Sequence, residues 1–180
     1  MNPAIEQQNP FITYLESLVK GGERGALAAL RRGLGKPPGT ALEMARYVVP
    51  FLPRERPWTE DAYFLVAALF AYWHQGRDAV AASPPENFGA SLALLALLDP
   101  QTGPSLDLRV TALLKSHRDD LPVHLRQAAG LLNAKGIPVN WQQLLKDILN
   151  WDHEDQFVQR AWARAFWGRR PEGATESKSD

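Results

Sequence analysis

Apolar residues recur every three or four positions along most of the chain, which is the spacing of one face of an α-helix. The apolar–polar alternation typical of a half-buried β-strand is nearly absent. Turn and capping residues divide the pattern into predicted helices at about residues 10–20, 23–33, 41–49, 60–74, 87–98, 106–117, 121–135, 141–151 and 153–167. The sequence therefore predicts an all-α fold of two packed helical bundles.

Several helix starts are predicted from side chains that accept a hydrogen bond from the first helical turn. Asn9 followed by Pro10 is such a start, with proline at the first helical position. Thr40 stands three residues before Glu43, the spacing of a capping box, which predicts a helix that stops at Pro50. The same capping role is expected, in later helices, of Thr59, Ser105, Asn140 and Asp152.

Two predicted helices, 60–74 and 87–98, are apolar on nearly every side, so we expect them in the middle of a bundle. The strongest cluster of turn residues, DPQTGPS at 99–105, is the predicted boundary between two halves. From Arg169 onward the residues are polar and poor in hydrophobic side chains. The predicted parts are an N-terminal helical bundle, a C-terminal helical bundle and a flexible polar tail, over residues 1–100, 101–168 and 169–180.

Composition narrows the class of protein. The chain has 180 residues, of which 45% are apolar and 22% are charged, as is usual for a soluble globular protein. No stretch is long and apolar enough for a membrane span, and no signal-peptide pattern opens the sequence. The absence of cysteine excludes a disulfide scaffold or a zinc–cysteine site and fits a reducing compartment. We therefore expect a cytoplasmic protein without membrane contact.

The formal net charge is zero, but the cations gather in three segments. Residues 20–36 hold five cations and one acid, residues 109–146 hold six cations and two acids, and residues 156–170 hold four cations and no acid. Such a distribution can build a positive face for a polyanion while the rest of the surface stays acidic. Three ordinary solvated helix faces have the same composition, so charge alone leaves both interpretations open.

The first basic segment contains ALRRGLGKPPGT, residues 29–40, whose G-x-G-K string invites comparison with a nucleotide-binding loop. A phosphate-binding loop of that kind follows a strand, leads into a helix and places a hydroxyl next to its lysine. Here a helix comes first and two prolines follow Lys36, which argues against a nucleotide cradle. Gly33 or Gly35 is instead expected to end the helix in a left-handed conformation.

Residues with catalytic or metal-binding spacing are scarce. The four histidines are scattered, and the acidic residues lack the spacing of a two-metal site. DHED at 152–155 can in principle bind a cation, but the helix dipole favours acids at a helix N-terminus, so capping is the preferred interpretation. With no cysteine and no serine in a nucleophile elbow, the sequence predicts a non-enzyme without metal or cofactor.

Helix geometry groups the arginines of the first basic segment. At about 100° per residue, Arg24 and Arg31 lie nearly above one another, with Arg32 one step round. All three flank the leucine stripe of their helix without interrupting it. A guanidinium binds phosphate oxygens through two parallel hydrogen bonds, which suits backbone binding without base readout.

The last predicted helix repeats this arrangement. Arg160 and Arg164 are four residues apart and share one face with Trp167. An exposed tryptophan beside two arginines can stack a nucleobase, or it can pack within the protein or cover a partner protein. We expect packing or a protein interface for Trp167.

The ordered set of motifs resembles a known family. In residues 121–168 the matching features are an L-P-x-x-L-R start, a G-I-x-V-x-W connection, an L-L-x-D-I-x-x-W helix and a closing W-A-R-x-F-W. In the N-terminal half, ALAALRRGLGKPPG supplies an L-R-R-G-x-G helix end. Together these motifs resemble the small subunit of the type I-E Cascade CRISPR surveillance complex, the CasB family, over most of residues 10–168.

This resemblance implies an all-helical, non-catalytic subunit that is present as a head-to-tail pair within the complex. Its implied partners are the backbone subunits, the large subunit, the hybrid of CRISPR RNA with target DNA, and the displaced DNA strand. The arginines that match the family motifs, and are implied to bind nucleic acid, are Arg31, Arg32, Arg126 and Arg164. Charge and helix geometry alone add Arg24, Lys36, Arg118, Lys135 and Arg160.

The expected function is therefore antiviral defence, in which basic surface patches bind the nucleic-acid backbone and stabilise target DNA and the R-loop. A purely protein-binding helical scaffold, whose arginines pair with acidic neighbours, is the alternative. A small enzyme whose acids converge only in the fold is a third interpretation.

Overall fold

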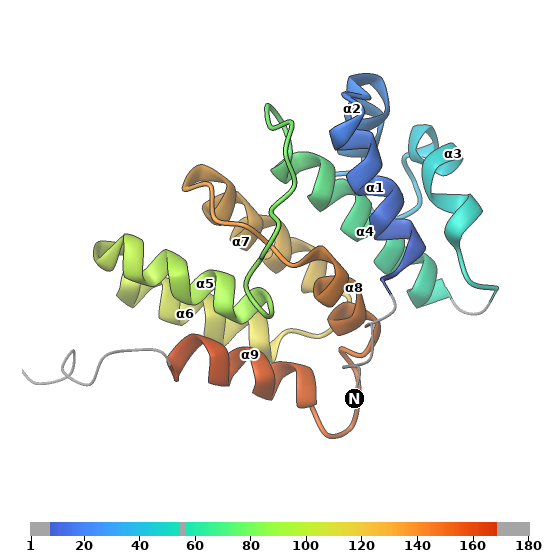
Figure 1. The fold of residues 1–180 in the computed structure, drawn as a ribbon. Helices are drawn as coiled ribbons and strands as arrows, with labels where there is room; N and C mark the ends of the chain where they lie inside the picture. The colour runs from blue at the N-terminus through green and yellow to red at the C-terminus, as the bar shows by residue number, and fades with distance from the viewer. Residues whose placement is uncertain (1–7, 55–56, 169–180) are drawn as a thin grey trace, which may run out of the picture.

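The computed structural model describes residues 8–54 and 57–168, and all regular structure in these ranges is helical (Figure 1). The α-helices are α1 (Pro10–Lys20), α2 (Arg24–Arg31), α3 (Ala45–Val48), α4 (Pro57–Trp73), α5 (Phe88–Leu98), α6 (Gly103–Lys115), α7 (Leu121–Ala134), α8 (Trp141–Leu149) and α9 (Phe157–Trp167). Three short 3₁₀ turns are η1 (Leu42–Met44), η2 (Val49–Phe51) and η3 (Pro100–Thr102). The all-α prediction is confirmed, and the predicted tail at 169–180 lies outside the described residues.

Two predicted caps form as expected. The Asn9 side chain accepts a hydrogen bond of 2.9 Å from the backbone N–H of Phe11, and Pro10 is the first residue of α1. The Asn140 side chain accepts one of 3.0 Å from the N–H of Gln143 at the start of α8. Each cap satisfies a backbone donor that the first helical turn leaves without an internal partner.

The two helices that are apolar on every side occupy the interior. Helix α4 is buried along most of its length and packs against α2, α7 and α8. Helix α5 packs against α7 and, most extensively, α9. Gly89 lies where α5 and α9 meet, and a Cβ at this position would collide with the backbone of Trp162. The close approach of these two helices therefore requires glycine.

One hydrophobic cluster runs through the described helices, with side chains from both sides of the turn at 99–105. Figure 1 shows α1 to α4 gathered on one side and α5, α6 and α9 on the other, with α7 and α8 between them. Helix α5 precedes the turn but packs on helices that follow it. The division of the chain at 99–105 stays a prediction.

The prediction of one continuous helix from Thr40 to Pro50 is wrong. The Thr40 hydroxyl donates to the carbonyl of Pro37 at 2.7 Å, so it does not cap a helix. The segment instead folds as η1, a four-residue α3 and η2. Pro50 lies within η2, where its missing N–H and fixed φ suit a tight turn better than a continued helix.

Two other predicted caps are displaced by proline. Helix α4 begins at Pro57, which places Thr59 inside its first turn. Helix α6 begins at Gly103, and the Ser105 hydroxyl donates to the carbonyl of Thr102 at 3.0 Å. In both helices a proline lies in the first turn, where its missing N–H costs nothing. Among the helices described, none has the length and apolar character to cross a membrane.

Candidate nucleic-acid interface

The loop that follows α2 has the turn geometry expected from its glycines. Helix α2 ends at Arg31, and the next residues close tight turns in which the N–H of Leu34 donates to the carbonyl of Arg31 at 3.0 Å. Gly35 has a φ of 76°, in the left-handed region that was expected of Gly33 or Gly35. Gly33 has no positive φ but packs against Met44, with no room for a Cβ.

Arg126 reaches this loop from α7. Its guanidinium lies against Gly35 so closely that a Cβ there would collide with it. Lys36 and Arg126, far apart in the sequence, thus border one pocket of about 370 Å³ between the loop, α4 and the start of α7. The structure therefore brings Arg126 of α7 next to Gly35 and Lys36, in the loop that follows Arg31 and Arg32.

We refer to Arg31, Arg32, Lys36 and Arg126 as the loop cluster. Arg32, Lys36 and Arg126 are exposed and Arg31 is half-buried. Arg32 has a carboxylate neighbour, Glu43, with 3.9 Å between the charged atoms, while among the described residues Arg31, Lys36 and Arg126 form no ion pair. Because exposed pairs at such a distance contribute little, most of this positive charge is uncompensated.

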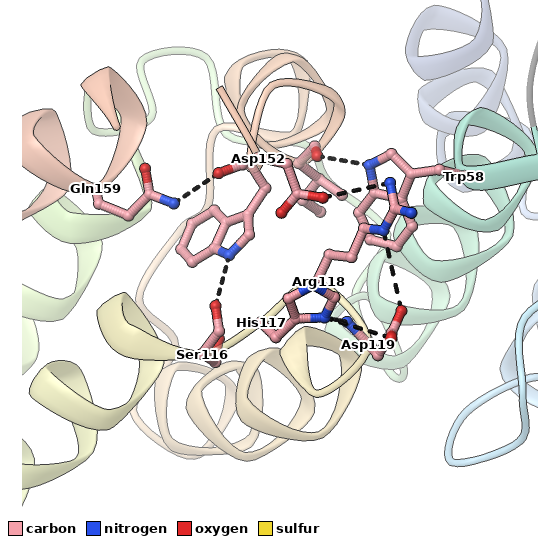
Figure 2. Close-up of polar contacts among 9 residues, drawn as sticks. Trp58, Ser116, His117, Arg118, Asp119, Asp152 and Gln159 are labelled. Carbon is pink, nitrogen blue, oxygen red and sulfur yellow. Dashed lines mark hydrogen bonds and ion pairs between the residues drawn. The ribbon is translucent and has the colours of Figure 1, made fainter. Parts of the chain in front are cut away.

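Arg118 has different surroundings, as Figure 2 shows. Its guanidinium lies 3.3 Å from the carboxylate of Asp152 and 4.0 Å from that of Asp119. The same group lies 5.6 Å from the ring centre of Trp58. Burial raises the pKa of the nearby Asp61 carboxyl. The charges of Glu60 and Asp119 raise this pKa further, although Arg118 acts in the opposite direction.

The contacts around Arg118 correct the interpretation of DHED as a helix cap. Helix α9 begins at Phe157, after Gln156 with a φ of 49°, so Asp152 is not its N-cap. Asp152 pairs with Arg118 instead. His153 lies 3.7 Å from Asp155 within the same turn. Across residues 8–54 and 57–168, no three histidine or acidic side chains gather as metal ligands.

Neighbouring hydrogen bonds tie the same region together (Figure 2). The indole N–H of Trp58 donates to the carbonyl of Ile148 at 3.2 Å. The indole of Trp151 donates to the carbonyl of Ser116 at 3.0 Å, and the Gln159 side chain donates to the carbonyl of Trp151 at 2.7 Å. Arg118 is thus one member of a network that joins α4, α8, α9 and the end of α6. We call this set of contacts the Arg118 network.

The remaining predicted cations are dispersed. Lys135, just beyond α7, lies 3.2 Å from the carboxylate of Asp99 at the end of α5. Arg24 is exposed at the start of α2. Arg160 and Arg164 are exposed on α9, where Arg164 borders a shallow hollow beside Asn87. Figure 1 shows α2 and α9 at opposite ends of the molecule, so Arg164 does not join the loop cluster.

Trp167 lies at the end of α9. Its indole N–H donates to the carboxylate of Asp107 on α6 at 3.3 Å, and its ring meets the ring of Phe166 at 5.1 Å. Trp167 is nevertheless 36% exposed. These contacts agree with the expected packing, and the exposed part leaves the other expected role, a protein interface, open.

Sequence reasoning missed the apolar walls of the pocket beside the loop cluster. They include Pro37 and Pro38 of the loop, Phe64 of α4 and Val123 of α7. In the sequence the two prolines after Lys36 served only as an argument against a nucleotide-binding loop. No sequence signal places Phe64 or Val123 opposite them, because that proximity depends on how α4 and α7 pack.

The chain matches the model of one protein family, CRISPR-associated protein Cse2, over residues 26–167. A protein of Thermus thermophilus, named CRISPR-associated protein Cse2, is 34% identical over 155 residues, which are 85% of this chain and 83% of that protein. The matched range covers most of both predicted halves and includes every residue of the loop cluster.

Two solved structures extend the similarity to the fold. A crystal structure of a Cse2-family protein from Thermus thermophilus superimposes with a TM-score of 0.75 at 32% identity, covering 88% of this chain and 96% of that one. A chain in a structure described as a CRISPR RNA-guided surveillance complex gives a TM-score of 0.76 at 28% identity, covering 87% of this chain and 89% of that one.

Proposed function

Because this chain belongs to the Cse2 family of CRISPR-associated proteins, we propose that it is the small subunit of a type I-E Cascade, the RNA-guided surveillance complex of CRISPR defence. In this role it is a non-catalytic cytoplasmic protein that assembles with the backbone and large subunits and stands beside a second copy of itself. Its similarity to a chain of an RNA-guided surveillance complex supports this assignment.

Within that assembly the loop cluster binds the phosphate backbone of the target nucleic acid. The observation that carries this proposal is the contact between Arg126 of α7 and Gly35 of the loop after α2. Through this contact Arg126 and Lys36, 90 positions apart in the sequence, border the same pocket. Guanidinium groups without an internal partner are free to form charge-assisted hydrogen bonds with phosphate oxygens.

The other candidate cations take lesser roles in the proposal. Arg24 stands on the same helix as Arg31 and extends the loop cluster. Arg160 and Arg164 form a second, separate area on α9 where a strand or a neighbouring subunit can be held. Arg118 and Lys135 already face acidic partners, so we assign them a structural role within the subunit and not a role in nucleic-acid binding.

Backbone binding suits the energetics of the R-loop. Exchanging a DNA duplex for an RNA–DNA hybrid is nearly balanced, so a small bias decides the outcome. Cations that contact the open state and not the closed duplex shift the equilibrium by their differential affinity. At about 0.5–1.5 kcal/mol for each hydrogen-bonded contact, a few contacts suffice. Such binding is tolerant of sequence and weakens as salt increases.

A purely protein-binding scaffold is the competing function, and one observation favours a protein-facing surface. Leu98 at the end of α5 is 67% exposed and Leu108 on α6 is 75% exposed. Exposed apolar side chains are typical of subunit contacts where they form one continuous patch. Leu98 and Leu108 are on α5 and α6, whereas the loop cluster is on α2, the following loop and α7. One molecule can therefore contact both a partner protein and nucleic acid.

The deciding experiment is the double substitution Arg31→Ala/Arg32→Ala in the assembled complex. We expect it to reduce retention of target DNA roughly tenfold or more, since two phosphate contacts are removed. The isolated subunit should keep its thermal stability, because both arginines lie beside the buried leucines of α2 and not among them. R-loops as persistent as those of the unaltered complex would refute the assignment of these arginines.

A further inference from the structure

The pocket beside the loop cluster has the size of a ligand site. Its volume of about 370 Å³ falls within the range of roughly 300–1,000 Å³ that is usual for small-molecule sites. Its lining includes the buried side chains of Met44, Phe64 and Leu65. Pro37, Pro38 and Val123, which is 53% exposed, also line it.

The charges at this pocket are unevenly placed. Among the described residues that line it, three are charged: Lys36, Arg126 and Asp119. Lys36 and Arg126 belong to the loop cluster and are exposed, whereas the walls between them are apolar. The carboxylate of Asp119 lies 3.3 Å from the ring of His117 and 4.0 Å from Arg118, which positions it as a hydrogen-bond acceptor.

We propose that this pocket receives a single unstacked nucleobase of the strand whose phosphates contact Lys36 and Arg126. In a nucleotide, a flat and largely apolar base is attached one sugar away from a phosphate. An apolar interior with two cations at its edge is complementary to both parts. A carboxylate such as Asp119 accepts a hydrogen bond from an exocyclic amino group but offers nothing to a methyl or a carbonyl edge.

The glycines of the loop give the pocket a fixed shape. Gly35 and Gly39 have φ values of 76° and 77°, so the backbone turns on both sides of the prolines in a way other residues rarely adopt. Between them Pro37 and Pro38 hold φ near −65° and have few conformations to lose on binding. A preformed pocket requires little ordering when the base enters.

This inference rests on the proposed function, since it needs a single strand on the loop cluster. Its test uses the full chain and two single strands of 20 nucleotides, one of ordinary mixed sequence and one with abasic sugars throughout. We expect the unaltered protein to bind the ordinary strand about tenfold more tightly, because stacking contributes favourably for each base held. Both strands carry the same phosphates, so the difference isolates the bases.

The decisive variant is Val123→Phe, which fills the pocket without changing any charge. It should lower the affinity for the ordinary strand to that for the abasic strand and leave the abasic strand unaffected. Val49→Phe is the matched control, because Val49 is equally exposed at 53% and does not border the pocket. It should bind both strands as the unaltered protein does.

Other outcomes separate this inference from the function on which it rests. If Val123→Phe binds both strands normally, or if the unaltered protein does not distinguish them, the base pocket is refuted. If in addition Lys36→Ala still weakens both strands, the proposed backbone binding survives. If Val123→Phe instead impairs assembly with the other Cascade subunits while DNA affinity is unchanged, the pocket holds a side chain of a partner protein and the inference is wrong.

Discussion

The loop cluster and the Arg118 network contain the same kind of residue in opposite circumstances. In the loop cluster, Arg31 and Arg126 form no ion pair with any described residue, and Arg32 has only a carboxylate at 3.9 Å. In the Arg118 network, the guanidinium is held between Asp152 and Asp119 and lies near an indole ring (Figure 2). The first arrangement leaves charge for an external anion, whereas the second uses it inside the molecule.

This difference indicates which basic residues are available to bind nucleic acid. An arginine that already pairs with two carboxylates must give up those contacts to bind a phosphate, and the acids repel the incoming anion. An arginine without such partners loses only its hydration. The neighbours of a cation therefore matter more than its exposure. Substitutions of Arg126 and Arg118 test that distinction, and two further experiments test the fold that positions both arginines.

The largest effect is expected where α5 meets α9. Gly89→Ala would place a Cβ against the backbone of Trp162, which cannot move as a flexible side chain does. We expect the free energy of unfolding to fall by about 3 kcal/mol or more. Chemical denaturation measures it. Gly103→Ala is the control, since a Cβ there meets no atom within 4 Å and should change stability little.

Lowering the pH should change the stability of the fold through His74 while leaving binding by the folded protein unchanged. This side chain is 2% exposed, and burial lowers its pKa to about 4 from an ordinary 6.5. The folded state thus binds fewer protons than the unfolded state between these values, so stability is lost as the pH falls from 6.5 towards 4. The loss should approach about 3 kcal/mol. Arginines do not titrate in this window, so binding by the folded protein should persist.

His74→Leu is the matching variant for denaturation curves at several pH values. It should flatten the pH dependence above pH 4, because no titrating group remains at that position. Asp147 acts in the opposite direction. Burial raises the pKa of its carboxyl, so its contribution to stability declines as the pH rises from the ordinary pKa of an aspartate towards the raised one. Equal pH dependence in the variant and the unaltered chain would show that another group is responsible.

Much of the fold could be predicted because it depends on local composition. Helices α4 and α5 are apolar on every side, so no arrangement other than the interior suits them. The helix expected from Thr40 failed because the hydroxyl bonds back to Pro37. Capping-box spacing does not ensure a cap, because the threonine hydroxyl can instead bond to the backbone of the preceding turn, as Thr40 does.

The candidate site was only partly predictable. Gly35 could be assigned a left-handed conformation because glycine adopts it without strain. Neither the contact between Gly35 and Arg126 nor the pairing of Arg118 with Asp152 follows from spacing, because each joins segments brought together by helix packing. Sequence identified the cations, but only the fold decides which of them keep their charge available.

Arg126→Ala tests the loop cluster directly, with a smaller effect than the first two experiments. We expect affinity for single-stranded DNA to fall about threefold to tenfold, the equivalent of one phosphate contact. A plot of log affinity against log salt should also lose about 0.7 from its slope, since one fewer counterion is released from the strand. An unchanged slope would mean that Arg126 touches no phosphate, whatever happens to the affinity.

Arg118→Ala is the counterpart of Arg126→Ala in the Arg118 network. We expect it to have the smallest effect of the four experiments. Its partners are partly exposed to solvent, so losing the ion pairs should reduce the free energy of unfolding by at most about 1 kcal/mol. Affinity and the salt slope should stay as in the unaltered chain, because Asp152 and Asp119 already occupy the guanidinium. If Arg118→Ala instead lost as much of the salt slope as Arg126→Ala, internal carboxylates would not withhold an arginine from nucleic acid. The contrast between the two regions would then have no bearing on binding.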